Sequence, residues 1–423
     1  MVMSIDQDRP QVHERGLNGP TRSEPFNRWF RYPAGFSRGA LVACFDAVPI
    51  QRGKAIADPF AGVATAGVHI VKRHSSFRGI EAHPLIAELS SLKFKPVDQL
   101  DGLQKYGVHL LSAMTMADIA SEHPMVLRCF DEVTLSFLAG LRDEIESEPT
   151  HPYYKLARWA LLATLRDTAS VGVGWPYQRP GVQKNPRVKS PSSRFIMRLT
   201  HMAEDLSSMS GDVDGSVVHG DSRLAEAWAN GLDGQKADGV ISSPPYLNNF
   251  DYADATRLEL YFLRYAKSWK EMTNTVRSSM MIATTQQTSG LSGVRLEEDL
   301  QNIKPIHSDI NFIVEKLVIE RKKRAKGKEY DRLVYQYFND MSLILENMAM
   351  NVISGGKVAL VIGDSAPYGV YVDTPKLIAM LASQYGFRLN NDQTLRLRGE
   401  RWTGIQTRHS HTLSERLIVL TAP

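Results

Sequence analysis

Three apolar runs of this chain end in a polar residue that is followed by a turn of small or rigid residues. The runs end at Asp58, Glu81 and Ser243. After the first two, apolar residues resume at helical spacing, which indicates strand–turn–helix units of an α/β fold. Ligands bind at the carboxyl ends of the strands in open α/β sheets, so the sequence predicts that these turns form a site.

The α/β pattern is interrupted twice. Residues 133–147 and 153–167 are amphipathic at helical spacing, and a basic, irregular stretch follows residue 267. We therefore expect a mostly parallel, doubly wound, Rossmann-like sheet with a final antiparallel strand, helices on both faces and a helical insert domain. The expected segments are a disordered tail (1–24), the first part of the core (25–98), a helical insert (99–212), the middle of the core (213–266), a second, basic insert (267–335) and the C-terminal part of the core (336–423).

The most informative turn is Ser243-Pro244-Pro245-Tyr246. Two prolines fix the backbone and remove two N–H donors, which leaves carbonyl groups to accept hydrogen bonds. The Ser243 oxygen and the Pro244 carbonyl are suited to hold a planar amino group, while the Tyr246 ring is suited to stack on the base that carries it. The alternative interpretation is an ordinary Pro-Pro turn between a strand and a helix.

Three other turns suit a nucleotide-like ligand. The glycine-containing turn after Asp58 lets the backbone approach such a ligand, and Glu81 is placed to accept from ribose hydroxyls. Asp221 follows another apolar run, where its carboxylate is suited to accept from an adenine amino group. The alternatives are an ordinary strand–helix turn, a solvated Glu81, and a helix N-cap at Asp221.

Composition narrows the classes of protein. The charged fraction of 23% and hydrophobic fraction of 43% are those of a soluble globular chain, and no apolar run is long enough to span a membrane. The first residues are too polar for a secretory signal. Cys44 and Cys129 are too few for a disulfide framework or a Cys-rich zinc site, so we expect no metal and a reducing cytoplasm. The net charge of +4 is compatible with nucleic acid without indicating it.

Together these segments resemble the amino-methyltransferases of DNA, the enzymes that methylate N4 of cytosine or N6 of adenine. Residues 58–65, DPFAGVAT, resemble their cofactor loop, with Ala64 in place of a second glycine. Residues 79–81 and 220–222 resemble the ribose-binding and adenine-contacting segments, and SPPY resembles the catalytic tetrapeptide. Residues 243–263 are also similar to a branch of the family with Asn, Asp-Tyr and Leu-Glu-Leu after the tetrapeptide.

The resemblance implies S-adenosylmethionine as the cofactor and double-stranded DNA with a flipped target base as the partner. The serine in the tetrapeptide is similar to that of N4-cytosine enzymes. The implied catalytic residues are Ser243, Pro244, Pro245 and Tyr246. The implied cofactor-binding residues are Phe36, Asp58, Phe60, Ala61, Gly62, Thr65, Glu81, Asp221, Ser222 and Ser243.

Several alternatives stay open within and beyond this class. They are an N6-adenine DNA methyltransferase, an RNA or protein-glutamine methyltransferase, and an inert nucleic-acid-binding module. A C5-cytosine enzyme is disfavoured because Cys44 and Cys129 lie in apolar contexts that indicate buried thiols rather than a nucleophile. The family also suggests a role in restriction–modification or phage defence, with a cognate restriction endonuclease.

Two basic regions are the candidates for DNA contact. Cations mixed with aromatic residues and turns follow Trp175, and a second basic run begins at Arg321. The alternative is that each is a solvated face. The expected DNA-binding residues are Arg179, Lys184, Arg187, Lys189, Arg194, Arg321, Lys322, Lys323 and Arg324.

Overall fold

The computed structural model describes residues 23–32, 35–95, 100–173, 179–183, 185, 186, 188, 190–209, 213–288, 301–398 and 411–423, with only the backbone of residues 179–182. The expected tail therefore lies almost entirely outside the described residues. None of the helices in the described ranges is both long and apolar enough to cross a membrane. Within the same ranges, no three His, Cys, Asp or Glu side chains are grouped to hold a metal ion.

A seven-stranded sheet forms the core, in the order β5-β2-β1-β6-β7-β9-β8. The parallel pairs are β5 with β2, β2 with β1, β1 with β6, and β6 with β7. β9 runs antiparallel to both of its neighbours, β7 and β8. The strand order reverses beside β1, so the loops after β1 and β6 diverge and leave a crevice there. The strands are β1 (Ala55–Asp58), β2 (Ser76–Glu81), β5 (Gly215–His219), β6 (Ala237–Ser242), β7 (Val352–Gly363), β8 (Arg388–Arg398) and β9 (Leu413–Thr421).

Helices cover both faces of the sheet because its central strands are apolar on both sides. Along β7, Ala359 and Val361 belong to one buried cluster, while Val358 and Leu360 belong to another. The first cluster includes side chains of α1 (Arg38–Ala47), α2 (Thr65–Val71) and α3 (Pro84–Leu92). The second includes side chains of α9 (Ala225–Gly231), α15 (Tyr330–Asn351) and α16 (Thr374–Ser383). The doubly wound fold with a final antiparallel strand is thus confirmed.

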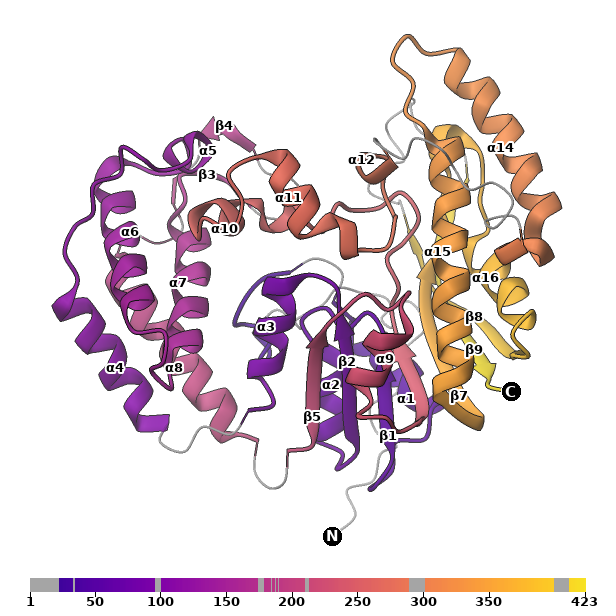
Figure 1. The fold of residues 1–423 in the computed structure, drawn as a ribbon, viewed down its shortest axis with the longest axis horizontal. Coiled ribbons are helices and arrows are strands. Elements are labelled where there is room, and N and C mark those ends of the chain that lie inside the picture. The colour runs from indigo at the N-terminus through magenta and orange to yellow at the C-terminus, as the bar shows by residue number, and fades with distance from the viewer. Residues whose placement is uncertain are drawn as a thin grey trace.

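A helical insert separates β2 and α3 from β5. Figure 1 shows its helices α4, α6, α7 and α8 gathered beside the β5 edge of the sheet. The two ends of the insert lie close together, since the ring of Phe94, which follows α3, packs directly against Gly215 at the start of β5. The elements of this insert are α4 (Leu100–Ala113), α5 (Pro124–Leu127), α6 (Glu132–Ser147), α7 (Tyr154–Thr168), β3 (Val171–Gly172), β4 (Arg179–Gln183) and α8 (Pro191–Ser207).

The region expected as a second insert is also helical. α10 (Arg257–Phe262) precedes this region, within the segment expected as the middle of the core. The region itself contains α11 (Trp269–Thr275), α12 (Thr285–Thr288) and α14 (His307–Lys322), which projects beside α15 (Figure 1). α15 begins at Tyr330, before the expected end of this insert at residue 335. α15 packs against the sheet, because its Tyr337, Phe338 and Met341 lie in the same buried cluster as side chains of β7.

Candidate active site

A cavity lies at the carboxyl ends of β1, β2, β5 and β6. About 710 Å³ of space, open solvent at its mouth included, lies between its lining residues. The strand order reverses at this point of the sheet, as expected for a ligand site in a doubly wound fold. The lining residues are Tyr32, Pro59, Phe60, Gly62, Glu81, Ala82, Asp221, Ser222, Ser243, Pro245, Asp251, Tyr252, Ser279, Met280, Met281 and Gln287.

The loop after β1 is a tight turn with two residues in the left-handed conformation, Gly62 (φ 51°) and Ala64 (φ 54°). Ala64 is the position at which the sequence departs from glycine, and the structure places it in the conformation that glycine favours. Helix α3 holds the loop from behind. Ser90 donates a 2.5 Å hydrogen bond to the Gly62 carbonyl, and the buried ammonium of Lys93 donates to the Val63 carbonyl.

Glu81 ends β2 and contacts this loop. One carboxylate oxygen accepts from the Gly62 N–H at 2.8 Å, and the other accepts from the His83 N–H at 2.8 Å. Burial raises the pKa of Glu81 to about 7, against the lowering effect of these two bonds. Each oxygen keeps a second lone pair, so Glu81 retains capacity to accept from a ligand.

Asp58 closes β1 and ties it to β6. Its Oδ1 accepts from the Ser242 hydroxyl at 2.6 Å and from the Phe60 N–H at 3.0 Å. Burial raises the pKa of Asp58 to about 7. Asp58 does not line the cavity, so its part is to fix the two strand ends that do.

Asp221 and Ser222 follow β5 and line the cavity. Asp221 accepts from the backbone N–H of Arg223 and pairs with its guanidinium at 2.6 Å. Arg223 in turn reaches Asp340 at 3.0 Å. The N-cap interpretation of Asp221 is wrong, because the cap of α9 is Leu224, which has no side-chain oxygen.

The tetrapeptide follows β6 directly. Ser243 donates to the Val361 carbonyl at 3.1 Å, which leaves the lone pairs of its oxygen to accept another hydrogen bond. Tyr337 of α15 donates to the Pro245 carbonyl at 2.9 Å. Ser243 and Pro245 line the cavity, and Pro244 is buried between them.

Tyr246 is fixed from three sides, although it does not line the cavity. Its hydroxyl donates to Glu415, the guanidinium carbon of Arg398 lies 5.0 Å from its ring centroid, and its ring edge lies against Gly363. A Cβ at Gly363 would lie 2.7 Å from the Tyr246 ring, so only glycine fits beside the ring. Burial raises the pKa of Tyr246 well above its ordinary value.

The structure does not bring every expected cofactor residue into the cavity. Phe36, Ala61 and Thr65 are buried and do not line it, and Thr65 donates to Asn27 at 3.1 Å. Asp251 and Tyr252, the Asp-Tyr pair that follows the tetrapeptide, line the cavity, and so does Tyr32. None of the three was assigned a role from the sequence, because no spacing or motif chemistry indicates what these side chains contact.

The expected DNA-binding residues have varied surroundings. Among the described cations, Arg194 pairs with Asp167 at 2.6 Å, Arg321 with Asp331 at 2.9 Å, and Lys323 and Arg324 both pair with Glu320. Lys322 is exposed, and no described residue forms an ion pair with it. Lys184, Arg187 and Lys189 lie outside the described residues, and only the backbone of Arg179 is described, in β4.

Comparison with known proteins supports a methyltransferase. No family model matches the chain. The sequence is similar to the type II methyltransferase M.BsoBI of Geobacillus stearothermophilus, with 22% identity over 426 aligned positions that cover 89% of this chain and 81% of that one. The chain is thus homologous to a type II methyltransferase.

One solved structure aligns over most of the chain. The rRNA methyltransferase aviRa of Streptomyces viridochromogenes covers 96% of this chain and 89% of its own, with 10% identity and a TM-score of 0.31. A TM-score this low does not establish a shared fold.

Proposed function

We propose that this protein is an S-adenosylmethionine-dependent DNA methyltransferase that methylates N4 of a cytosine flipped out of the double helix. One observation carries the proposal. Ser243 and Pro245 line the same cavity as Phe60, Glu81 and Asp221. The proposed holder of the amino group is therefore next to the proposed cofactor site, as direct methyl transfer requires.

The residues present fit S-adenosylmethionine. Glu81 would accept from the ribose hydroxyls, because each of its carboxylate oxygens accepts only one hydrogen bond from the protein. Asp221 would accept from the adenine amino group by exchanging one of its contacts with Arg223, whose N–H, Nε and Nη2 already donate to both of its oxygens. Phe60 and the Gly62 turn would lie along the nucleoside. When bound, the cofactor supplies an electrophilic methyl group on a sulfonium sulfur.

The tetrapeptide would act on the acceptor. An exocyclic amine is a poor nucleophile because its lone pair is delocalised into the ring. Hydrogen bonds from this amine to the Ser243 oxygen and the Pro244 carbonyl would favour a pyramidal nitrogen, whose lone pair is free to attack. Ser243 is suited to this part because its own proton is donated to the Val361 carbonyl. As the nitrogen forms its bond to the methyl carbon, the bond from that carbon to sulfur would break, and its electron pair would stay on sulfur. The nitrogen would then release one proton to water, with no covalent intermediate on the protein.

The choice of DNA and of cytosine has separate support. The type II methyltransferase to which the chain is homologous favours a restriction–modification or phage-defence role, with a cognate restriction endonuclease as the partner. The serine of the tetrapeptide favours N4 of cytosine, and N6 of adenine is the second candidate. In this proposal, the catalytic core consists of segments 25–98, 213–266 and 336–423. DNA is contacted by the two inserts, residues 99–212 and 267–335.

The proposal is tested by expression in a host that lacks DNA methylation. Single-molecule sequencing of the genomic DNA distinguishes N4-methylcytosine from N6-methyladenine, and a Ser243→Ala, Tyr246→Ala double variant serves as the control. We expect one modified motif with the wild type and none with the variant. N6-methyladenine would correct the target base. Absence of any modification, in a protein that binds S-adenosylmethionine by calorimetry, would redirect the search to RNA or protein substrates.

A further inference from the structure

Arg166 of the helical insert contacts two chain segments that carry walls of the cavity. It lies on α7. Its Nη1 donates a 2.5 Å hydrogen bond to the carbonyl of Arg31, the residue before Tyr32. Its Nη2 donates at 2.6 Å to the carbonyl of Ala255, three residues after Tyr252. One guanidinium therefore holds the backbone beside both tyrosines.

The same guanidinium is locked in place on its remaining sides. Its Nε and Nη2 donate to the two carboxylate oxygens of Glu259 at 2.5 and 3.1 Å, the bidentate geometry that arginine alone provides. Glu259 is completely buried on α10. The Phe30 ring covers the guanidinium, with its centroid 3.9 Å from Cζ. Glu259 is also the acidic residue of the Leu-Glu-Leu run in the sequence.

The held segments form one side of the cavity. The rings of Tyr32 and Tyr252 lie with their centroids 6.0 Å apart, and both line the cavity together with Glu81. All the lining residues come from the core segments or from residues 279–287, and none from the helical insert as described. The insert therefore touches this wall from behind, through Arg166.

We infer that Arg166 is a positioning residue that sets the Tyr32–Tyr252 wall of the cofactor pocket. This inference rests on the proposed function, because it takes the ligand of the cavity to be S-adenosylmethionine. Arg166 does not contact the ligand. It fixes the backbone of two segments that are far apart in the sequence, so the helical insert helps to build the pocket.

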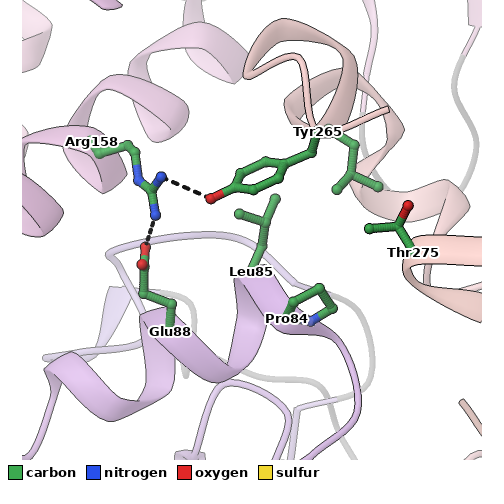
Figure 2. Close-up of a pocket in the computed structure, with 7 residues that line it drawn as sticks. Pro84, Leu85, Glu88, Arg158, Tyr265 and Thr275 are labelled. Carbon is green, nitrogen blue, oxygen red and sulfur yellow. Dashed lines mark hydrogen bonds and ion pairs between the residues drawn. The ribbon is translucent and has the colours of Figure 1, made fainter. Parts of the chain in front are cut away.

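A second arginine of α7 provides the matched control. Arg158, two helical turns before Arg166, also joins the insert to the core, through Glu88 of α3 at 2.5 Å. Figure 2 shows Arg158 between Glu88 and Tyr265, at a separate cavity of 310 Å³. Neither Glu88 nor Tyr265 lies within three residues of Tyr32 or Tyr252 in the sequence, whereas Arg31 and Ala255 do. Arg158 and Arg166 thus lie on the same helix and each pairs with a glutamate of the core, but only Arg166 contacts the backbone beside Tyr32 and Tyr252.

The test is calorimetric titration of S-adenosylmethionine into the full-length wild type, Arg166→Lys and Arg158→Lys, each below its melting temperature. Lysine keeps the charge but cannot make the bidentate contact. We expect both variants to melt at a lower temperature. Arg166→Lys raises the Kd about tenfold, whereas Arg158→Lys leaves it within about twofold. Glu259→Gln is the second variant and also raises the Kd, since it removes the carboxylate charge from the bidentate contact with Arg166.

Several outcomes separate the inference from the proposed function. An unchanged Kd in Arg166→Lys and in Glu259→Gln overturns the inference and leaves a purely structural ion pair. If Arg166→Lys does not fold, Glu259→Gln decides between the two. A wild type that binds the cofactor without methylating DNA overturns only the choice of substrate. A wild type that does not bind the cofactor overturns both.

Discussion

The hydroxyl of Tyr246 donates a 2.9 Å hydrogen bond to the carboxylate of Glu415, which is buried in β9. Glu415 also accepts from Arg396 of β8 at 3.0 Å. The last residue of the tetrapeptide is therefore fixed by the antiparallel end of the sheet, while its first residue is fixed by Val361 of β7. The geometry of this short turn depends on strands that enter the sheet much later in the sequence.

Removing the ring of Tyr246 should lower kcat/KM far more than removing its hydroxyl alone. Tyr246→Ala removes the ring proposed to stack on the base, an interaction worth about 1–3 kcal/mol, so kcat/KM for methylation should fall roughly 10- to 100-fold. Tyr246→Phe removes only the bond to Glu415, and Arg396 still pairs with that carboxylate, so kcat/KM should stay within about fivefold. Steady-state methylation assays check both. Equal losses in the two variants would argue against stacking.

Ala64→Gly should stabilise the protein. The left-handed conformation costs alanine about 1–2 kcal/mol, and glycine offsets part of this gain by its larger loss of backbone entropy. A net gain of up to about 1 kcal/mol is expected, with unchanged or tighter cofactor binding. Urea unfolding measures it. The control Ala66→Gly lies in α2 and should destabilise by about 1 kcal/mol. Destabilisation by Ala64→Gly would contradict the turn geometry.

Glu81 should make stability depend on pH. Burial raises its pKa from 4.5 to about 7, so between these values the folded state binds more protons than the unfolded state. The free energy of unfolding contributed by this group therefore falls as pH rises from about 4.5 to 7, by roughly 3 kcal/mol. Urea unfolding at pH 5 and pH 8 should show Glu81→Gln gaining stability relative to wild type at the higher pH. A constant difference at the two pH values would exclude the raised pKa.

Lys322 should contribute more to DNA binding than Arg324 does. Arg324 already pairs with Glu320 at 3.0 Å and stacks on Tyr368, with Cζ 4.0 Å from the ring centroid, whereas Lys322 forms no ion pair with a described residue. Lys322→Ala should lower the slope of log K against log salt by about 1, and Arg324→Ala by less. Fluorescence anisotropy of labelled duplex DNA from about 50 to 200 mM salt measures both. A larger effect at Arg324 would contradict this order.

The main features of the fold follow from the sequence because the central strands are apolar and end at recognisable turns. Asp58, Glu81 and Ser242 close β1, β2 and β6 at or within one residue of the expected ends. The amphipathic stretches of the insert form α6 and α7. The apolar contexts of Cys44 and Cys129 correctly predict that both thiols are buried. Local pattern suffices wherever one element buries one continuous apolar face.

The rest depends on tertiary contacts that no local pattern contains. β8 is an edge strand with mostly exposed polar residues, so it lacks the alternation that marks a strand. Tyr32 and Tyr252 lie far apart in the sequence, and Arg166, from a third segment, contacts the backbone beside each of them. Lysine is rarely buried, yet Lys93 is buried against the loop that follows β1 and donates to the Val63 carbonyl. Whether the expected cofactor and DNA residues bind those ligands stays a prediction.

The contact between Phe94 and Gly215 has a consequence for how this chain can diversify. Phe94 follows α3, where the chain leaves the core for the helical insert, and Gly215 begins β5, where the chain returns; the two residues are in contact. A segment whose ends meet can be lengthened, shortened or exchanged without moving the strands on either side. We therefore expect that the helical insert can be changed in length without moving β2 or β5. The contacts of Arg166 with the carbonyls of Arg31 and Ala255 are the part of the insert that such a change would have to keep, if Arg166 positions the Tyr32–Tyr252 wall as inferred above.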